Sequence, residues 1–415
     1  MKTTHAFILY SSLWTLYLAQ GILYDKGGIV SHLLLVLTLL MSIYYAVVVN
    51  KTRKRPLFIK ALNALIVMFT IYGLVYMASG NVYFLHFSSE PWAQYKYLQN
   101  VYMSMLPIYA FYYFAKKGAI GERWINYWIL FFVIRTIITF FMKQEELLMD
   151  ALDNGENSEE FTNNVGYSFV SLIPLLYLWK GKTWMQNTLL GICTIFIFLS
   201  IKRGAILIGS LMIAYFLYEK INSTKGRSRY AIIGITTLIV IAIGVYVVQF
   251  ISTSDYFQSR IEETLNGNTS GRDELVLPLL HHFYYETTAA QILFGNGADS
   301  TIGIAGNFAH NDWIEILTCN GLVGVMIFLF FFIALAMAVM KSHKIRHNDY
   351  SVALALTTFK LFASTLFSMS YSSISLALSL CLGLCIADLY MGNKKPTTKT
   401  IAQQQKEITT SDTIS

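Results

Sequence analysis

Two arginines and a histidine stand out in an otherwise apolar chain, because their side chains suit the handling of a phosphate group. Arg203 follows an apolar run, whereas Arg272 and His310 lie in the long polar stretch 252–318. Guanidinium groups offer forked donors that fit phosphate oxygens, and fixed cations stabilise the charge that develops on a departing pyrophosphate. A histidine beside such a site can take a proton from an attacking hydroxyl. We therefore predict an anion site formed by Arg203 and Arg272, with His310 as the general base.

Two neighbouring residues extend this candidate site. Lys202 precedes Arg203 and would add a second cation to the pyrophosphate site. Glu315 lies about one helical turn beyond His310 and could orient the imidazole or take the proton itself; we favour His310, because histidine is the commonest general acid–base group. The cations also have structural explanations. Lys202 and Arg203 could reach lipid headgroups from a helix end, and Arg272 could pair with a nearby acid.

The composition indicates that these residues are positioned by helices that cross a lipid bilayer. Of the 415 residues, 55% are hydrophobic and 13% are charged, and the mean hydropathy is +0.50. A helix of about 20 apolar residues spans about 30 Å of hydrocarbon and satisfies its own backbone there. The apolar runs are too long for barrel strands. We predict an all-α polytopic membrane protein with about 12 transmembrane helices, at residues 5–24, 27–49, 61–79, 98–115, 125–142, 165–179, 188–201, 204–218, 231–250, 319–340, 352–370 and 372–392.

A predicted break at Lys202 and Arg203 sets the orientation of the chain. These residues interrupt the apolar stretch 188–218, and two adjacent cations in mid-bilayer would be costly. With a helix boundary there, 22 of the 31 Lys and Arg residues fall on the side of the two termini, and seven fall on the other side. Since cytoplasmic loops retain Lys and Arg, we predict cytoplasmic termini and a large periplasmic loop at 252–318. The cations are dispersed over helix ends, so we expect no nucleic-acid partner.

The chain is predicted to have four regions. Residues 1–187 form N-terminal membrane helices, and residues 188–340 form a catalytic region that includes the loop 252–318. Residues 341–392 form C-terminal membrane helices. Residues 393–415 form a polar cytoplasmic tail that is expected to be disordered.

The predicted periplasmic loop is expected to contain short helices. Capping-box spacing predicts a first helix from Ser270 toward Ala290. A glycine-rich turn at 294–297 and a flexible stretch through Gly306 are expected to follow. Asn311 is a suitable N-cap for a second short helix, which an Asn-Gly pair would end.

Two further cations, Arg135 and Lys360, fall within predicted spans. A charge at membrane depth is expensive and usually faces a cavity or a partner. These residues could pair with an acid of the outer loop, or they could line a cavity for the lipid-linked substrate or the acceptor. His281 and His282 have no metal-binding spacing, and the four cysteines lie in or near apolar spans. We therefore expect no metal and no cofactor.

Several short motifs lie between residues 188 and 340: Lys202-Arg203-Gly204-Ala205, Ser270-Gly271-Arg272, Phe294-Gly295-Asn296-Gly297, and Ala309-His310-Asn311 followed by Glu315, Asn320-Gly321 and Gly324. In this pattern the chain resembles the O-antigen ligase and polymerase superfamily of bacterial polytopic glycan transferases. The usual Ser-Arg-Gly of that superfamily is replaced here by Lys202-Arg203-Gly204, which preserves the charge.

The resemblance implies a metal-independent, inverting glycosyltransferase of the bacterial inner membrane. It would transfer a glycan from undecaprenyl pyrophosphate to an acceptor hydroxyl on the periplasmic face. By analogy, Arg203 and Arg272 would hold the pyrophosphate, and His310 would activate the acceptor. The acceptor would be a further glycan for a polymerase and the lipid A core for a ligase, and the sequence does not choose between them.

Two other functions compete with this interpretation. Twelve spans and two buried cations would also suit a flippase or another transporter of polysaccharide or lipid-linked oligosaccharide. Such a transporter should tolerate the loss of His310, whereas a transferase should not. A non-catalytic assembly protein would tolerate changes at all the outer residues, but the chain has no large exposed interaction domain.

Overall fold

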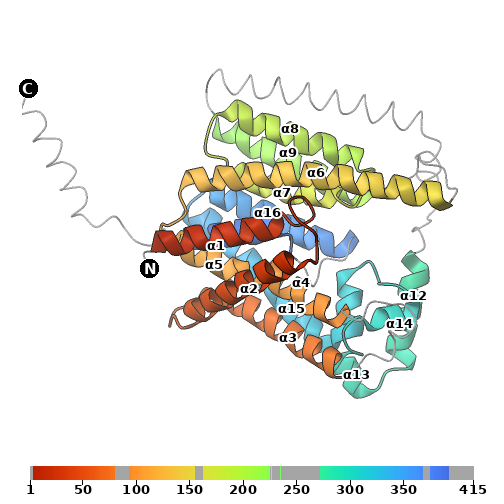
Figure 1. The fold of residues 1–415 in the computed structure, drawn as a ribbon. Coiled ribbons are helices and arrows are strands. Elements are labelled where there is room, and N and C mark those ends of the chain that lie inside the picture. The colour runs from red at the N-terminus through yellow and green to blue at the C-terminus, as the bar shows by residue number, and fades with distance from the viewer. Residues whose placement is uncertain are drawn as a thin grey trace, which may run out of the picture.

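The computed structural model describes residues 3–79, 93–154, 162–224, 272–367 and 374–391, together with Gly226 and Gly234. The regular elements in these ranges are all helices, which confirms the predicted all-α class for the described residues (Figure 1). They are α1 (Thr3–Leu18), α2 (Ile29–Asn50), α3 (Leu57–Ser79), α4 (Ala93–Met105), α5 (Pro107–Lys116), α6 (Glu122–Asn154), α7 (Gly166–Tyr177), α8 (Thr183–Leu199), α9 (Arg203–Ser223), α12 (Arg272–Tyr285), α13 (Ala289–Phe294), α14 (Ser300–Ala305), α15 (Asp312–Ile345), α16 (Asp349–Phe367) and α17 (Leu376–Met391).

The described part of the chain contains six helices that are long and apolar enough to cross a membrane, namely α2, α3, α6, α9, α15 and α16. Helices α7, α8 and α17 are apolar but shorter. On α2, the large apolar side chains of Ile29, Leu33 and Leu40 are all more than half exposed. Contact with lipid accounts for such a face, because soluble surfaces rarely carry large apolar patches. The chain is therefore a helical membrane protein.

Two breaks between described helices fall within predicted apolar stretches. The predicted break before Arg203 is confirmed, since α8 ends at Leu199 and α9 begins at Arg203. The predicted span 98–115 is divided in the structure, since α4 ends at Met105 and α5 begins at Pro107, although Leu106 between them has helical backbone angles. Proline has no N–H to donate to the preceding turn. Apart from Gly234, the predicted span 231–250 lies outside the described residues, as do residues 252–271 of the predicted loop and the tail 393–415.

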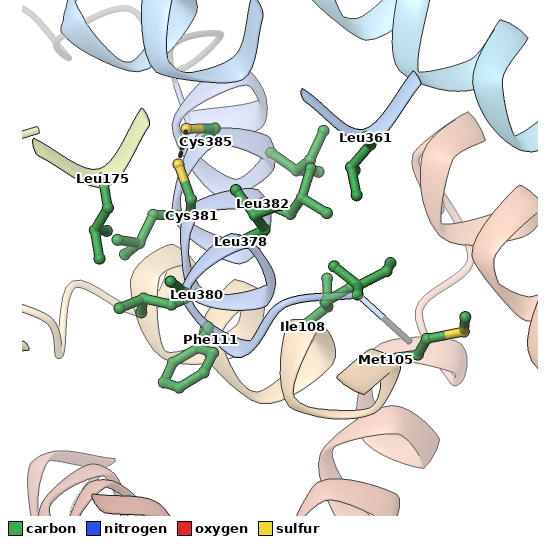
Figure 2. Close-up of a cluster of buried hydrophobic side chains, with 14 of the residues drawn as sticks. Met105, Ile108, Phe111, Leu175, Leu361, Leu378, Leu380, Cys381, Leu382 and Cys385 are labelled. Atoms are coloured by element: carbon green, nitrogen blue, oxygen red, sulfur yellow. Dashed lines mark hydrogen bonds between the residues drawn. The ribbon is translucent and has the colours of Figure 1, made fainter. Parts of the chain in front are cut away.

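Helices α5 and α17 form the centre of the bundle, and their side chains are buried on nearly every side. A helix that is apolar all round is suited to such a position. A Cβ atom at Gly383 of α17 would lie 2.6 Å from Phe111 Cβ, so glycine allows α17 to approach α5 closely. Figure 2 shows Leu378, Leu380 and Leu382 of α17 near Ile108 and Phe111 of α5. Helix α5 has 10 residues and α17 has 16, whereas a helix needs about 20 residues to span a bilayer.

Helices α12, α13 and α14 gather at one end of the bundle, on the right in Figure 1. The first predicted loop helix is divided in the structure: α12 ends at Tyr285, and a capping box formed by Thr288 and Gln291 begins α13. The expectation of flexible chain through Gly306 is wrong for residues 300–305, which form α14. The second predicted helix is confirmed, because Asn311 caps the start of α15.

The opposite end of the bundle is held by polar contacts between helix ends. Lys180, just before α8, lies 2.6 Å from the Asp349 carboxylate at the start of α16. His347, between α15 and α16, lies 3.0 Å from Glu219 near the end of α9. The described helices therefore have two distinct ends, one with α12–α14 and one with these charged connections.

Candidate functional site

Lys202 and Arg203 lie at the start of α9. Ile201 has a left-handed backbone conformation (φ 53°), Lys202 is the N-cap residue, and Arg203 is exposed. The first N–H groups of an α-helix have no intrahelical acceptor, and the helix dipole favours an anion there. The start of this 21-residue helix therefore adds backbone donors to the two cations. This arrangement is suited to bind a phosphate group.

Gly204 allows the first turn of α9 to pack against α7 and α16. A Cβ atom at this position would lie 2.1 Å from the Tyr167 hydroxyl and 3.4 Å from Phe367 Cβ. The Tyr167 hydroxyl in turn donates a long hydrogen bond of 3.5 Å to the Phe367 carbonyl. The start of α9 is therefore fixed beside Tyr167 and the C-terminal end of α16.

His310 lies between α14 and α15 and is half-buried. Its backbone is left-handed (φ 51°), a conformation that costs a residue with a side chain about 1 to 2 kcal/mol. The next residue, Asn311, accepts hydrogen bonds from the N–H groups of Trp313 at 3.0 Å and Ile314 at 3.3 Å. This cap fixes the start of α15 directly after His310.

Glu315 holds the other side of the His310 segment. Its side chain is fully buried, and its Oε2 accepts a hydrogen bond of 2.9 Å from the Ala309 N–H. Its Oε1 accepts a hydrogen bond of 2.6 Å from the Thr301 hydroxyl on α14. Glu315 is not among the residues that line either described cavity. Of the two roles considered for Glu315, the geometry favours positioning over proton transfer.

Two glycine-containing motifs pack closely against each other, Phe294-Gly295-Asn296-Gly297 and Asn320-Gly321. We call this contact the glycine lock. Gly321 breaks α15 with a positive φ of 66°, and the carbonyls before the break accept from a neighbouring turn. The N–H of Asn296 donates to Thr318 O at 2.9 Å, and the N–H of Gly297 donates to Cys319 O at 3.0 Å. A Cβ atom at Gly321 would lie 2.5 Å from the Gly295 backbone nitrogen. Only glycine fits here, and the contact fixes the first part of α15.

Tyr72 of α3 forms hydrogen bonds to both motifs of the glycine lock. Its hydroxyl donates hydrogen bonds to the carbonyls of Phe294 and Asn320, the second at 3.2 Å. The predicted loop motifs are thus attached to a membrane helix from the N-terminal half of the chain.

The starts of α9 and α15 meet the same part of α16. The Trp313 Nε1–H donates to the Thr365 hydroxyl at 2.9 Å, whereas Gly204 and Tyr167 lie beside Phe367. Thr365 and Phe367 are separated by about 3 Å along the helix axis, at 1.5 Å per residue. The structure therefore brings the segments that carry Arg203 and His310 to one end of α16.

A cavity of about 390 Å³ lies beside this end of α16, between α1, α4, α6, α7, α16 and α17. Arg135 and Lys360 both line it. Arg135 Nε donates to the Leu18 carbonyl at 2.6 Å, and the Lys360 side chain is only 5% exposed. Among the described residues, no acidic side chain lines this cavity or forms an ion pair with either cation. Both cations thus face a shared cavity, as one of their two interpretations requires, and Lys360 also interacts electrostatically with Asp312 of the predicted outer loop, which relates to the other.

Asp312 connects Lys360 to the His310 segment. It is the first residue of α15, is fully buried, and interacts electrostatically with Lys360. It also lines a small cavity of about 20 Å³ that shares Ile374 with the large cavity. Lys360 therefore lies between the large cavity and the helix start that follows His310.

Arg272 is the first residue of α12, but its side chain lies outside the described part of the structure. Helix α12 packs against α14 and α15, which flank His310.

The two histidines of α12 contact Glu286. A hydrogen bond from His282 lowers the pKa of Glu286, which also lies 3.5 Å from His281. Within the described ranges, no group of His, Cys, Asp and Glu residues is arranged to hold a metal ion.

Sequence reasoning did not identify Thr301, Tyr167 or Asp312. Thr301 and Tyr167 carried no motif, and their importance comes from partners that are distant in sequence. Asp312 had a local signal, since an acid directly after the Ala309-His310-Asn311 motif is suited to a first helical turn. Its interaction with Lys360 depends on the fold.

No protein-family model matches this chain, and no curated protein sequence matches it. The superfamily resemblance thus depends on the short motifs alone.

Proposed function

We propose that this protein transfers a glycan from undecaprenyl pyrophosphate to an acceptor hydroxyl, as a polymerase or ligase of a bacterial surface polysaccharide. One observation carries the proposal: a cationic helix start, a histidine segment and a hydrophilic cavity all meet the C-terminal half of α16. A lipid-pyrophosphate glycosyltransferase needs these three parts. The cationic helix start would bind the leaving group, the histidine would accept a proton, and the cavity would hold the sugar.

The reaction would be a single displacement at the anomeric carbon. The acceptor oxygen forms the new C–O bond while the bond to the pyrophosphate breaks, so the configuration inverts. His310 takes the hydroxyl proton. The departing undecaprenyl pyrophosphate keeps the electron pair, and Arg203, Lys202 and Arg272 stabilise its negative charge. This scheme assigns the charge stabilisation to protein cations and makes the enzyme metal-independent.

The proposed location is the bacterial inner membrane, with the active site facing the periplasm. Several basic residues lie at the helix ends opposite to α12–α14, among them Lys180, Lys220, Lys341 and Arg346. Such an excess is typical of the cytoplasmic side. The partners would be membrane lipid, the undecaprenyl-pyrophosphate-linked glycan, and an acceptor glycan or lipid A core.

A transporter of lipid-linked oligosaccharide is the second candidate, and the cavity favours it. Arg135 and Lys360 lie at membrane depth, where charged residues often mark a transport pathway. The two candidates differ at His310, which a transporter does not need for chemistry.

The test is complementation of a gene deletion with the wild-type protein, His310→Ala, or His281→Ala as a control. His281 is an exposed histidine on α12 that contacts Glu286 and the Tyr285 ring and lies outside the proposed site. We expect His310→Ala to abolish the polysaccharide ladder on gels at an unchanged protein level in the membrane, and His281→Ala to preserve it. Single-repeat product would indicate a polymerase. Loss of lipid A-linked polymer with accumulation of carrier-linked glycan would indicate a ligase. An unchanged ladder with His310→Ala would refute both.

A further inference from the structure

The large cavity contains a buried cation, Lys360, that has no ion-pair partner among the described residues. Lys360 is 5% exposed, and it forms no hydrogen bond or ion pair with the described residues. Asp312 acts on it electrostatically. Burying an unpaired ammonium group costs several kcal/mol, and an anion that enters the site would offset this cost. We infer that the cavity binds an acidic sugar residue of the glycan substrate, with its carboxylate held by Arg135 and Lys360. This inference deepens the proposed function and rests on it.

The remaining cavity wall supports an anionic ligand. Arg135 donates its Nε–H to the Leu18 carbonyl, and its terminal NH₂ groups have no hydrogen-bond partner among the described residues, so they can bind a carboxylate. The first turn of the 16-residue helix α17 also lines the cavity through Leu376 and Ala377. N–H groups of a first turn have no intrahelical acceptor and favour negative charge. Two cations and a helix start thus act on one space, and no described lining residue is acidic.

The polar groups of the wall are suited to a sugar. Gln20, Asn100, Ser168 and Ser171 provide amide and hydroxyl groups that can pair with ring hydroxyls. The cavity volume of about 390 Å³ falls within the range of about 300 to 1,000 Å³ that is typical of small-molecule sites. An aliphatic lipid tail could not form hydrogen bonds with these groups.

The position of the cavity favours a sugar carboxylate over the diphosphate of the lipid carrier. Lys202 and Arg203 do not line the cavity; they lie at the start of α9, next to Tyr167, which does line it. A diphosphate at the exposed Arg203 leaves its lipid tail free to reach the bilayer, and Tyr167 then separates it from the inner cavity. The outer cations would bind the diphosphate, and the inner cations would bind the carboxylate of an adjoining sugar.

The test compares two matched sugars, methyl β-glucuronide and methyl β-glucoside, which differ in a carboxylate at C6. Full-length protein in phosphatidylcholine nanodiscs avoids competing anionic headgroups. Saturation-transfer NMR would measure binding to the wild-type protein and to Lys360→Met, Arg135→Met and Lys143→Met. Lys143 is the matched control, because it lies on α6 with Arg135 but outside the cavity, paired with Glu146. Inorganic pyrophosphate is the competitor.

We expect the glucuronide to bind the wild-type protein at least about tenfold more tightly than the glucoside, as expected for one charge-assisted contact. Lys360→Met and Arg135→Met should each remove this preference, whereas Lys143→Met should retain it. Two cavity variants are used so that misfolding of one leaves the other informative. Equal affinity for the two sugars, absence of glucuronide binding, or retention of the preference in the folded cavity variants would overturn the inference.

Two controls separate this inference from its rivals. If pyrophosphate displaces the glucuronide and Lys360→Met abolishes pyrophosphate binding, the cavity holds the carrier diphosphate and the inference is wrong. His310→Ala should leave the glucuronide preference unchanged. If that variant also sustains polysaccharide synthesis, the proposed transferase function fails independently of the sugar site.

Discussion

Replacing Glu315 by glutamine or by alanine separates a positioning role from proton transfer. In Glu315→Gln, the amide oxygen can accept from the Ala309 N–H, and the amide NH₂ can donate to the Thr301 hydroxyl, which can reverse its direction. Both links to the His310 segment are then retained. We expect the stability of this variant to change by about 1 kcal/mol or less, which is within the range of one neutral hydrogen bond.

Glu315→Ala removes both links. The Ala309 N–H and the Thr301 hydroxyl belong to buried residues, and each unsatisfied group costs about 1 to 3 kcal/mol. The total local cost is therefore about 2 to 6 kcal/mol, which is enough to release the strained conformation of His310. A displacement of about 1 Å in a catalytic group can lower the rate about 100-fold.

The assay is glycan transfer by purified protein, together with the melting temperature of each variant in detergent. If Glu315 positions His310, Glu315→Gln should retain activity within about threefold, which corresponds to less than 1 kcal/mol in the barrier. Glu315→Ala should lose about 100-fold. A Glu315→Gln variant that melts like the wild-type protein but is inactive would refute the positioning role and identify Glu315 as the proton acceptor.

Two further predictions concern close contacts at the site. Gly204→Ala places a methyl group 2.1 Å from the Tyr167 hydroxyl and should destabilise the protein by about 1 to 3 kcal/mol; adding Tyr167→Phe removes that oxygen and should restore most of the melting temperature. Equal losses with and without Tyr167→Phe would contradict this contact. Gly321→Ala combines a positive φ with a 2.5 Å approach to the Gly295 backbone and should lower transfer activity and stability strongly, by about 2 kcal/mol or more. The control is Gly191→Ala on α8, where an added Cβ meets nothing within 4 Å. Similar melting temperatures for Gly321→Ala and Gly191→Ala would argue against the glycine lock between α13 and α15.

Helix ends could be predicted where a local cause determines them. Lys202 and Arg203 interrupt an apolar stretch at a point where charge would be costly in a bilayer, and α9 begins at Arg203. Asn311 caps α15 through its own side chain, and Gly321 breaks that helix through a backbone conformation that glycine favours. These causes act within a few residues, so the sequence alone reveals them.

Other features depend on contacts between distant segments. The sequence suggested flexible chain around Gly303, whereas the Thr301 hydroxyl binds the buried Glu315 and residues 300–305 form α14. The apolar run 98–115 suggested one membrane helix, and its second half is the short, largely buried α5 at the centre of the bundle. Composition cannot distinguish a helix that faces lipid from one that is enclosed by other helices.

The C-terminal half of α16 explains why the candidate site could not be assembled from motifs alone. Lys360 and Ser364 are one turn apart and both line the cavity, so they share a face of the helix. Thr365 and Phe367 lie on other faces, toward Trp313 of α15 and Gly204 of α9. One helix without any recognised motif thus contacts the cavity, the histidine segment and the arginine segment. A change on one face of α16 can therefore shift the other two, so the cavity variants have to be compared at matched stability before an effect is assigned to lost charge.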